Sequence, residues 1–286
     1  MLAGPLALAV FLGPPDRSRE NTAPSAAPFR ESAVVNATAA APSDGSGRNT
    51  SQPALTIPLG TILPVRLGTL LSPGHSKPGE LITAKLMQEV PLPMEQRIPR
   101  GSTLYGKVVA IAPSAANGGA EISLRFDSLQ IHKEPIPLTA NLRAIAGYVD
   151  VDQAQIPVLS SGEGEVYAWL PTVQIGGDDV FGRDGVVTRW NDSSQVVGRS
   201  TPDGVLGHIV ASQKGGCRGP VDGNDHLQAL WVFSADACGV YGLPGVTIAD
   251  GGRSNPAGLI VLRFAGKKVR VASGAGMLLR VDEAGR

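Results

Sequence analysis

LTIPLGTILPVRLGTLL, residues 55–71, is the stretch that decides the fold. Within it, apolar and polar residues alternate in ILPVRL, residues 62–67, with the period of two that is typical of a half-buried β-strand. Gly60 stands just before this run, where a turn would lead into the strand. The stretch therefore predicts a β-strand.

Four further runs of this kind follow at short spacing. They are ELITAKLMQEV at 80–90, STLYGKVVAIA at 102–112, AEISLRFDSLQI at 120–131 and EPIPLTANLRAIA at 134–146. The turn signals PGH, PRG and NGG separate them, and no amphipathic segment of helix length does. Residues 258–281 read as two or three closing strands. Because parallel strands need long crossover connections, the pattern predicts an antiparallel β-barrel or sandwich.

The composition supports a folded, mostly β protein. Of the 286 residues 42% are hydrophobic, which is enough for a sizeable core. The 36 glycines and 23 prolines, with only 5% aromatic residues, suit short strands joined by many turns. The 25 basic and 25 acidic residues cancel, so net charge favours neither a nucleic acid nor an anionic membrane surface. We expect no nucleic-acid partner.

The N-terminal part of the chain differs from the rest. Residues 1–13, MLAGPLALAVFLG, form an incomplete signal-peptide-like segment that is too short for a membrane-spanning helix. Residues 14–53 are rich in Ala, Pro, Ser, Asn, Thr and Gly and have no hydrophobic period. Such a stretch buries too little apolar surface to offset its ordering entropy, so we predict a disordered tether.

The strand region resembles the C-terminal β-barrel domain of TrbI-like conjugation and type IV secretion proteins. The matching motifs are Ile57-x-x-Gly60-Thr61-x-Leu63-x-x-x-Leu67, Leu71-Ser72-Pro73-Gly74, Ile82-Thr83-Ala84, Ile98-Pro99-x-Gly101-Ser102-x-Leu104-x-Gly106 and Leu124-Arg125-Phe126. Gly106 lies inside a predicted strand, where glycine permits the sharp bend of a small barrel. The resemblance covers residues 55–146 and 257–281.

The resemblance implies an envelope-located barrel that docks with partners through its edges and loops. Channel-forming members of the family carry a membrane-spanning N-terminal helix and a long apolar helical insertion. Neither feature is found in this sequence, so pore formation is not carried over to this chain.

The interval 147–256 reads as an inserted Gly-rich subdomain of short strands and loops. Cys217 and Cys238 each lie next to glycine, which favours a disulfide; two buried free thiols are the alternative. The aromatic residues form a candidate ligand surface for a glycan or a peptide. Its proposed members are Trp169, Trp190, Trp231 and Tyr241. The other interpretation is that they form the core of the subdomain.

The sequence offers little that indicates catalysis. There is no G-x-S-x-G motif, and no H-x-x-x-H or C-x-x-C spacing suggests zinc. Asp178, Asp179 and Asp184 in GGDDVFGRDG are weak calcium candidates, because Ca²⁺ prefers oxygen ligands; solvated turn aspartates are the alternative. We expect no enzyme, no catalytic residue and no cofactor.

The sequence thus predicts four segments. They are residues 1–13, the tether at 14–53, a TrbI-like barrel at 54–146 plus 257–283, and the inserted subdomain at 147–256. The expected function is that of a non-catalytic exported protein of the periplasm or cell envelope. Its partners would be envelope proteins or copies of itself, in a secretion- or conjugation-type assembly. The alternative is a secreted module that binds carbohydrate or peptide through the aromatic-rich insertion.

Overall fold

A computed structural model describes most of the chain after residue 54. The described residues are 55–113, 119–159, 172–177, 179–181, 185–189, 191–211, 217, 226–249, 251 and 256–284. All of them belong to one compact unit, Gln52–Arg286. The predicted signal-like segment at 1–13 and the tether at 14–53 lie outside the described residues.

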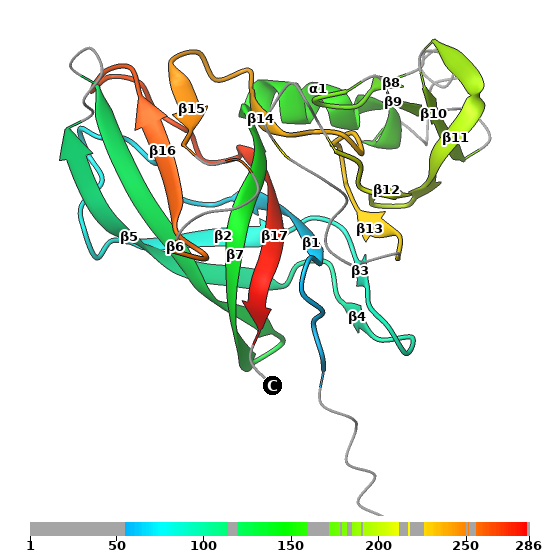
Figure 1. Ribbon diagram of the computed structural model, residues 1–286, viewed down its shortest axis with the longest axis horizontal. Helices are drawn as coiled ribbons and strands as arrows, with labels where there is room; N and C mark the ends of the chain where they lie inside the picture. Colours follow the sequence, from blue (N-terminus) through cyan, green and yellow to red (C-terminus); the bar gives the residue numbers. More distant parts are fainter. Residues whose placement is uncertain are drawn as a thin grey trace, which may run out of the picture. The chain divides into compact units, whose positions relative to one another are not determined.

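Six strands close into an antiparallel β-barrel, which confirms the predicted fold class (Figure 1). The strands are β1 (Ile62–Leu67), β2 (Leu81–Leu86), β5 (Thr103–Pro113), β6 (Ala120–Ile131), β7 (Glu134–Ala146) and β17 (Gly276–Ala284). Around the ring the order is β7, β17, β1, β2, β5 and β6, and β6 pairs with β7 to complete it. Every pairing in this ring is antiparallel.

The barrel closes at one end and opens at the other because β6 changes partners along its length. Its second half pairs with β7, from Ser128↔Pro137 to Ile131↔Glu134. Its first half pairs instead with β16 (Ile260–Phe264), which in turn pairs with β15 (Val246–Ile248). Strand β14 (Gly239–Tyr241) lies parallel to the last residues of β7. The added strands thus pair with edges that the splayed β6 and β7 leave open.

Gly106 lets β5 and β6 approach closely at a bend. The register of these strands shifts between Tyr105 and Gly106, which marks a β-bulge. A Cβ atom at Gly106 would lie 2.2 Å from the carbonyl oxygen of Arg125. The position therefore has no room for a side chain, as the predicted role of glycine in a bending strand requires.

Strand β1 is buried on both faces, which differs from the half-buried strand that the sequence predicts. Leu63, Val65 and Leu67 belong to the apolar cluster inside the barrel. Ile62 belongs to a second apolar cluster that includes Trp231. Local alternation describes one strand alone, whereas the second cluster next to β1 includes residues distant in the sequence, such as Trp231 and Phe233.

The interval 147–256 contributes a second sheet, a helix and two strands of the barrel's sheet. The second sheet is antiparallel, in the order β13-β12-β11-β10-β9-β8. Its strands are β8 (Thr172–Val173), β9 (Asp179–Phe181), β10 (Val186–Arg189), β11 (Asp192–Thr201), β12 (Gly204–Gly207) and β13 (Gln228–Ala229). Strands β14 and β15 join the barrel's sheet instead.

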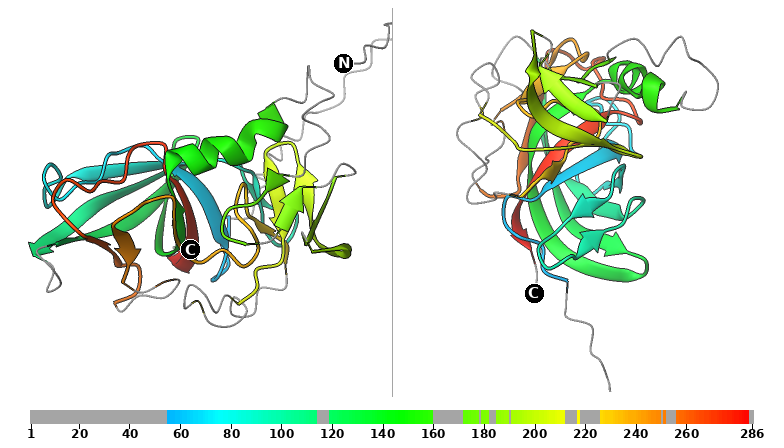
Figure 2. Two further views of the ribbon diagram at one scale, coloured as in Figure 1. Left: turned by 90° about the horizontal axis from the view of Figure 1, so that it is seen from above. Right: turned by 90° about the vertical axis from the view of Figure 1, so that its right-hand side faces the viewer.

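Helix α1 (Tyr148–Leu159) was not predicted by the sequence analysis, which expected strands and loops there. In the view of Figure 1 it lies between β14 and the second sheet, and the right-hand view of Figure 2 shows it at one side of the molecule. Its Val151 is fully buried, and Asp152 pairs with Arg66 of β1 at 2.7 Å. A separate two-stranded hairpin joins β3 (Val90–Pro91) and β4 (Arg97–Ile98).

Replacing Gly106 with alanine should destabilise the barrel. The new methyl group would collide with the backbone of β6, so we expect a loss of roughly 2 kcal/mol or more in the free energy of unfolding. Urea unfolding followed by circular dichroism measures it. Gly266→Ala is the matched control, because a Cβ there meets no atom within 4 Å. Equal stability of the two variants would contradict the close approach of β5 and β6.

Candidate functional site

A disulfide joins Cys217 to Cys238, as the sequence predicted, and the alternative of free thiols is wrong. The two Cα atoms are 6.0 Å apart, and both residues are buried. Cys238 comes directly before β14, the strand that pairs with the end of β7. The bridge therefore ties a distant loop position to the edge of the barrel's sheet.

Arg143 of β7 is a buried cation next to this bridge. Its Nε donates to the carbonyl oxygen of Ala237 at 2.9 Å, and its Nη2 donates to that of Val210 at 2.6 Å. Burial lowers the pKa of Arg143 to about 10, and the Asp236 carboxylate offsets part of this effect. The side chain stays charged at neutral pH and fastens two loops of the interval 147–256 to the barrel.

A cluster of polar side chains lies where β9 meets the loop before Cys238. Asp179 is 1% exposed, and its Oδ2 accepts hydrogen bonds from Ser234 Oγ at 2.6 Å and from Ala235 N at 2.8 Å. Its Oδ1 lies 2.8 Å from Nη1 of Arg189. Asp236 Oδ1 lies 2.5 Å from the same Ser234 hydroxyl. The carboxylate of Asp179 is thus used to hold β9, β10 and this loop together.

The contacts of this cluster link segments of the chain to one another. Ser234 is fully buried, and its hydroxyl forms hydrogen bonds with the carboxylates of Asp179 and Asp236, whereas a serine nucleophile is activated by an adjacent general base such as histidine. In the described part of the chain, no three His, Cys, Asp or Glu residues lie close enough to hold a metal ion. The four histidines there are all exposed. They are His75, His132, His208 and His226.

The weak calcium candidates are only partly described. Asp178 and Asp184 lie outside the described residues. The carboxylate of Asp179 is paired with the guanidinium of Arg189, whereas a calcium ion would need a carboxylate that is open to it. The calcium site stays a prediction.

The candidate aromatic surface is described at two of its four positions. Trp231 is 3% exposed and packs in the second apolar cluster, with the Arg66 guanidinium 5.7 Å from its ring centroid. The Tyr241 hydroxyl donates to the carbonyl oxygen of Cys238 at 2.7 Å, and burial raises the pKa of this phenol. Trp169 and Trp190 lie outside the described residues. The ligand surface stays a prediction; Trp231 has the burial of a core residue, and the half-buried Tyr241 packs against the same cluster.

Two buried glutamines join the barrel to the second sheet, and the sequence analysis missed both. Gln88 Oε1 accepts from the backbone N–H of Trp231 at 2.6 Å, and its Nε2 donates to the carbonyl oxygen of Val205 at 2.9 Å. Gln228 Oε1 accepts from the N–H of Ile62 at 2.9 Å. The local sequence KLMQEV mixes apolar and charged residues, so it gave no signal that Gln88 is buried.

No family model, no curated protein and no solved structure matches this chain. Among the residues that the structure describes, no helix combines the length and the apolar character needed to cross a membrane. What the geometry of the site shows is a set of buried polar groups that hold separate segments of the chain in place.

Breaking the disulfide should lower stability. Replacing both Cys217 and Cys238 with serine opens a loop closed across 21 positions, which corresponds to about 3 kcal/mol in the chain-entropy model. Urea unfolding of the wild-type protein with and without dithiothreitol should show the same loss. The double variant serves as the control, because its transition should not respond to the reductant. A wild-type transition that does not shift with dithiothreitol would contradict the disulfide.

Replacing Gln88 with methionine should loosen the contact between the barrel and the second sheet. The N–H of Trp231 would lose its acceptor in a buried site, whereas the carbonyl oxygen of Val205 would keep its bond from the N–H of Leu230, so we expect a cost of roughly 1–3 kcal/mol. Hydrogen exchange should then accelerate at the Trp231 amide and stay unchanged in β6. Gln153→Met on the exposed face of α1 is the matched control, for which we expect no measurable change.

Proposed function

We propose that this chain is a non-catalytic exported protein of the cell envelope, whose β-barrel acts as a scaffold that binds other proteins. The observation that supports this proposal is the filled interior of the barrel. Leu63, Leu104, Phe126 and Met277 from four different strands are all fully buried in one apolar cluster. A barrel filled by its own side chains has its loops and outer strands available for contacts.

The disulfide supports an oxidising location outside the cytoplasm. Disulfides form and persist in such compartments and are rare where thiols are kept reduced. The bridge between Cys217 and Cys238 is consistent with export. Periplasm or cell envelope is the location that we propose.

The link to a secretion- or conjugation-type assembly rests on the TrbI-like motifs. Residues 55–146 and 257–281, which carry the resemblance, supply all six strands of the closed barrel up to Val281. A motif pattern that follows the barrel strands supports a shared architecture. The proposed partners are envelope proteins of such an assembly or further copies of this chain.

Fractionation of native cells tests the proposed function. The membrane envelope is solubilised without reductant and run on a native gel, and the chain is detected by mass spectrometry. We expect it in a large complex together with secretion or conjugation proteins. A free monomer outside the cytoplasm would contradict the assembly.

The two glycine variants give a matched control for this experiment. If binding needs the intact barrel, Gly106→Ala should leave the complex while Gly266→Ala remains in it. Retention of an unfolded Gly106→Ala chain would show that the barrel is not the binding element.

A further inference from the structure

Unpaired cations are concentrated at one end of the barrel. Eight described basic side chains have acidic partners within 4.0 Å, and Arg143 is buried. In the described ranges, seven basic side chains are exposed without an acidic partner. They are Lys77, Lys85, Lys133, Arg199, Lys267, Lys268 and Arg270. Four of these seven lie in two loops, residues 68–80 and 265–275, which we call the basic loops.

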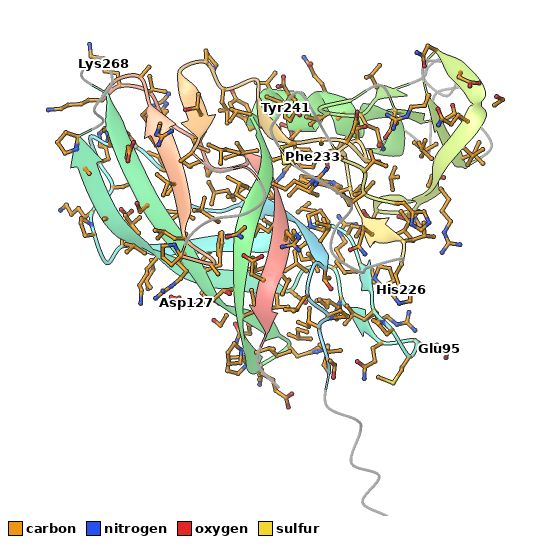
Figure 3. All side chains as sticks on the ribbon, in the orientation of Figure 1. Glu95, Asp127, His226, Phe233, Tyr241 and Lys268 are labelled. Atoms are coloured by element: carbon orange, nitrogen blue, oxygen red, sulfur yellow. A yellow bond between two sulfur atoms is a disulfide. The ribbon has the colours of Figure 1, made fainter. Side chains whose placement is uncertain are left out.

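The basic loops touch each other. Leu71 and Val271 exchange both of their backbone hydrogen bonds at 2.9 Å, and a Cβ at Gly74 would lie 3.3 Å from the carbonyl oxygen of Lys267. The only acidic residue in either loop is Glu80, which accepts a hydrogen bond from the backbone N–H of Lys77. Figure 3 shows Lys268 at the end of the barrel that β5 reaches with its last residues. Positive charge is therefore segregated there although the whole chain is neutral.

An uncharged apolar strand end lies beside the basic loops. Strand β5 pairs with β2 only as far as Lys107, and the following residues 109–113, VAIAP, carry no charge. Val109 is 41% exposed, and Ala110, Ala112 and Pro113 are exposed as well. Across the sheet, Pro113 pairs with Ala120 and Ala120 with Phe264, the residue that leads into the loop 265–275. Apolar surface and free cations thus lie at the same end.

We propose that this end of the barrel docks on an anionic lipid surface. The cations of the basic loops would lie against the lipid headgroups, and the strand end 109–113 would enter the interface. Basic residues around an exposed apolar segment are the arrangement of peripheral membrane-binding proteins. Each cation near an anionic surface is worth about fivefold in affinity at low salt. This inference goes beyond the proposed function and does not depend on it.

The shape of the strand end favours lipid over a partner β-strand. A β-bulge falls between Val108 and Ala110, and Pro113 ends the strand. Both features interrupt the regular row of hydrogen-bonding groups that an added strand needs. A lipid interface imposes no such register, so the same features leave membrane docking unaffected.

Vesicle sedimentation tests the inference with the oxidised full chain. We expect binding to vesicles of phosphatidylcholine with about 30% of the anionic lipid phosphatidylglycerol, little binding to phosphatidylcholine alone, and release at high salt. The triple variant Lys267→Glu, Lys268→Glu and Arg270→Glu should bind about 100-fold more weakly. Thermal unfolding checks that each variant is folded.

The chain offers a control with the same change of net charge. Lys85→Glu, Lys133→Glu and Arg199→Glu alter three exposed unpaired cations outside the basic loops. This variant should stay within a few-fold of wild type. If the two triple variants lose the same affinity for anionic vesicles, the effect is one of net charge alone and the inference is overturned. Equal binding of the wild-type chain to neutral and anionic vesicles, or no binding to either, would also overturn it.

A second pair of variants tests the strand end. Val109→Asp should weaken binding to anionic vesicles, whereas Val196→Asp on β11, which is also exposed, should not. If the chain is retained on immobilised polyglutamate but does not bind vesicles, the partner of the basic loops is an acidic protein, and membrane docking is overturned. The proposed protein assembly would be unaffected by that result, because fractionation tests it separately.

Discussion

The pairing of β6 with β7 is the constraint on which the rest of the structure depends. Each edge of a strand can pair with one neighbour at a time, so β6 and β7 share only the residues near their common turn. Beyond Ser128 the edge of β6 is open to β16, and beyond Pro137 the edge of β7 is open until β14 reaches it. Closure at one end thus determines where the added strands can lie.

The position of β14 in turn locates the polar junction between the barrel and the interval 147–256. Because β14 follows Cys238, its pairing with β7 brings the disulfide close to Arg143. Buried polar groups cost free energy unless they are hydrogen-bonded, and Arg143 and Gln88 use theirs to bind loop backbones. Gln174 is an exception, since both of its amide atoms are buried without a hydrogen-bond partner among the described residues.

The same topology explains how a neutral chain acquires a charged end. Strand β1 pairs with β17, so the loop that follows β1 and the loop that precedes β17 leave the barrel at the same end. Their cations come from positions about 190 residues apart (Lys77 and Lys267). Net charge averages over the whole surface, whereas a membrane or a protein partner responds to the local density of charge.

The sequence by itself determined the mostly β class and the approximate strand positions, and it favoured a disulfide between the two cysteines without deciding it. Alternation, turn residues and flanking glycines are local signals, and Gly106 could be interpreted from its place within a strand. Only the tertiary structure decided the closure of the barrel, the burial of Trp231 and the roles of Gln88 and Arg143. These depend on contacts between residues more than 60 positions apart, which a local pattern does not encode.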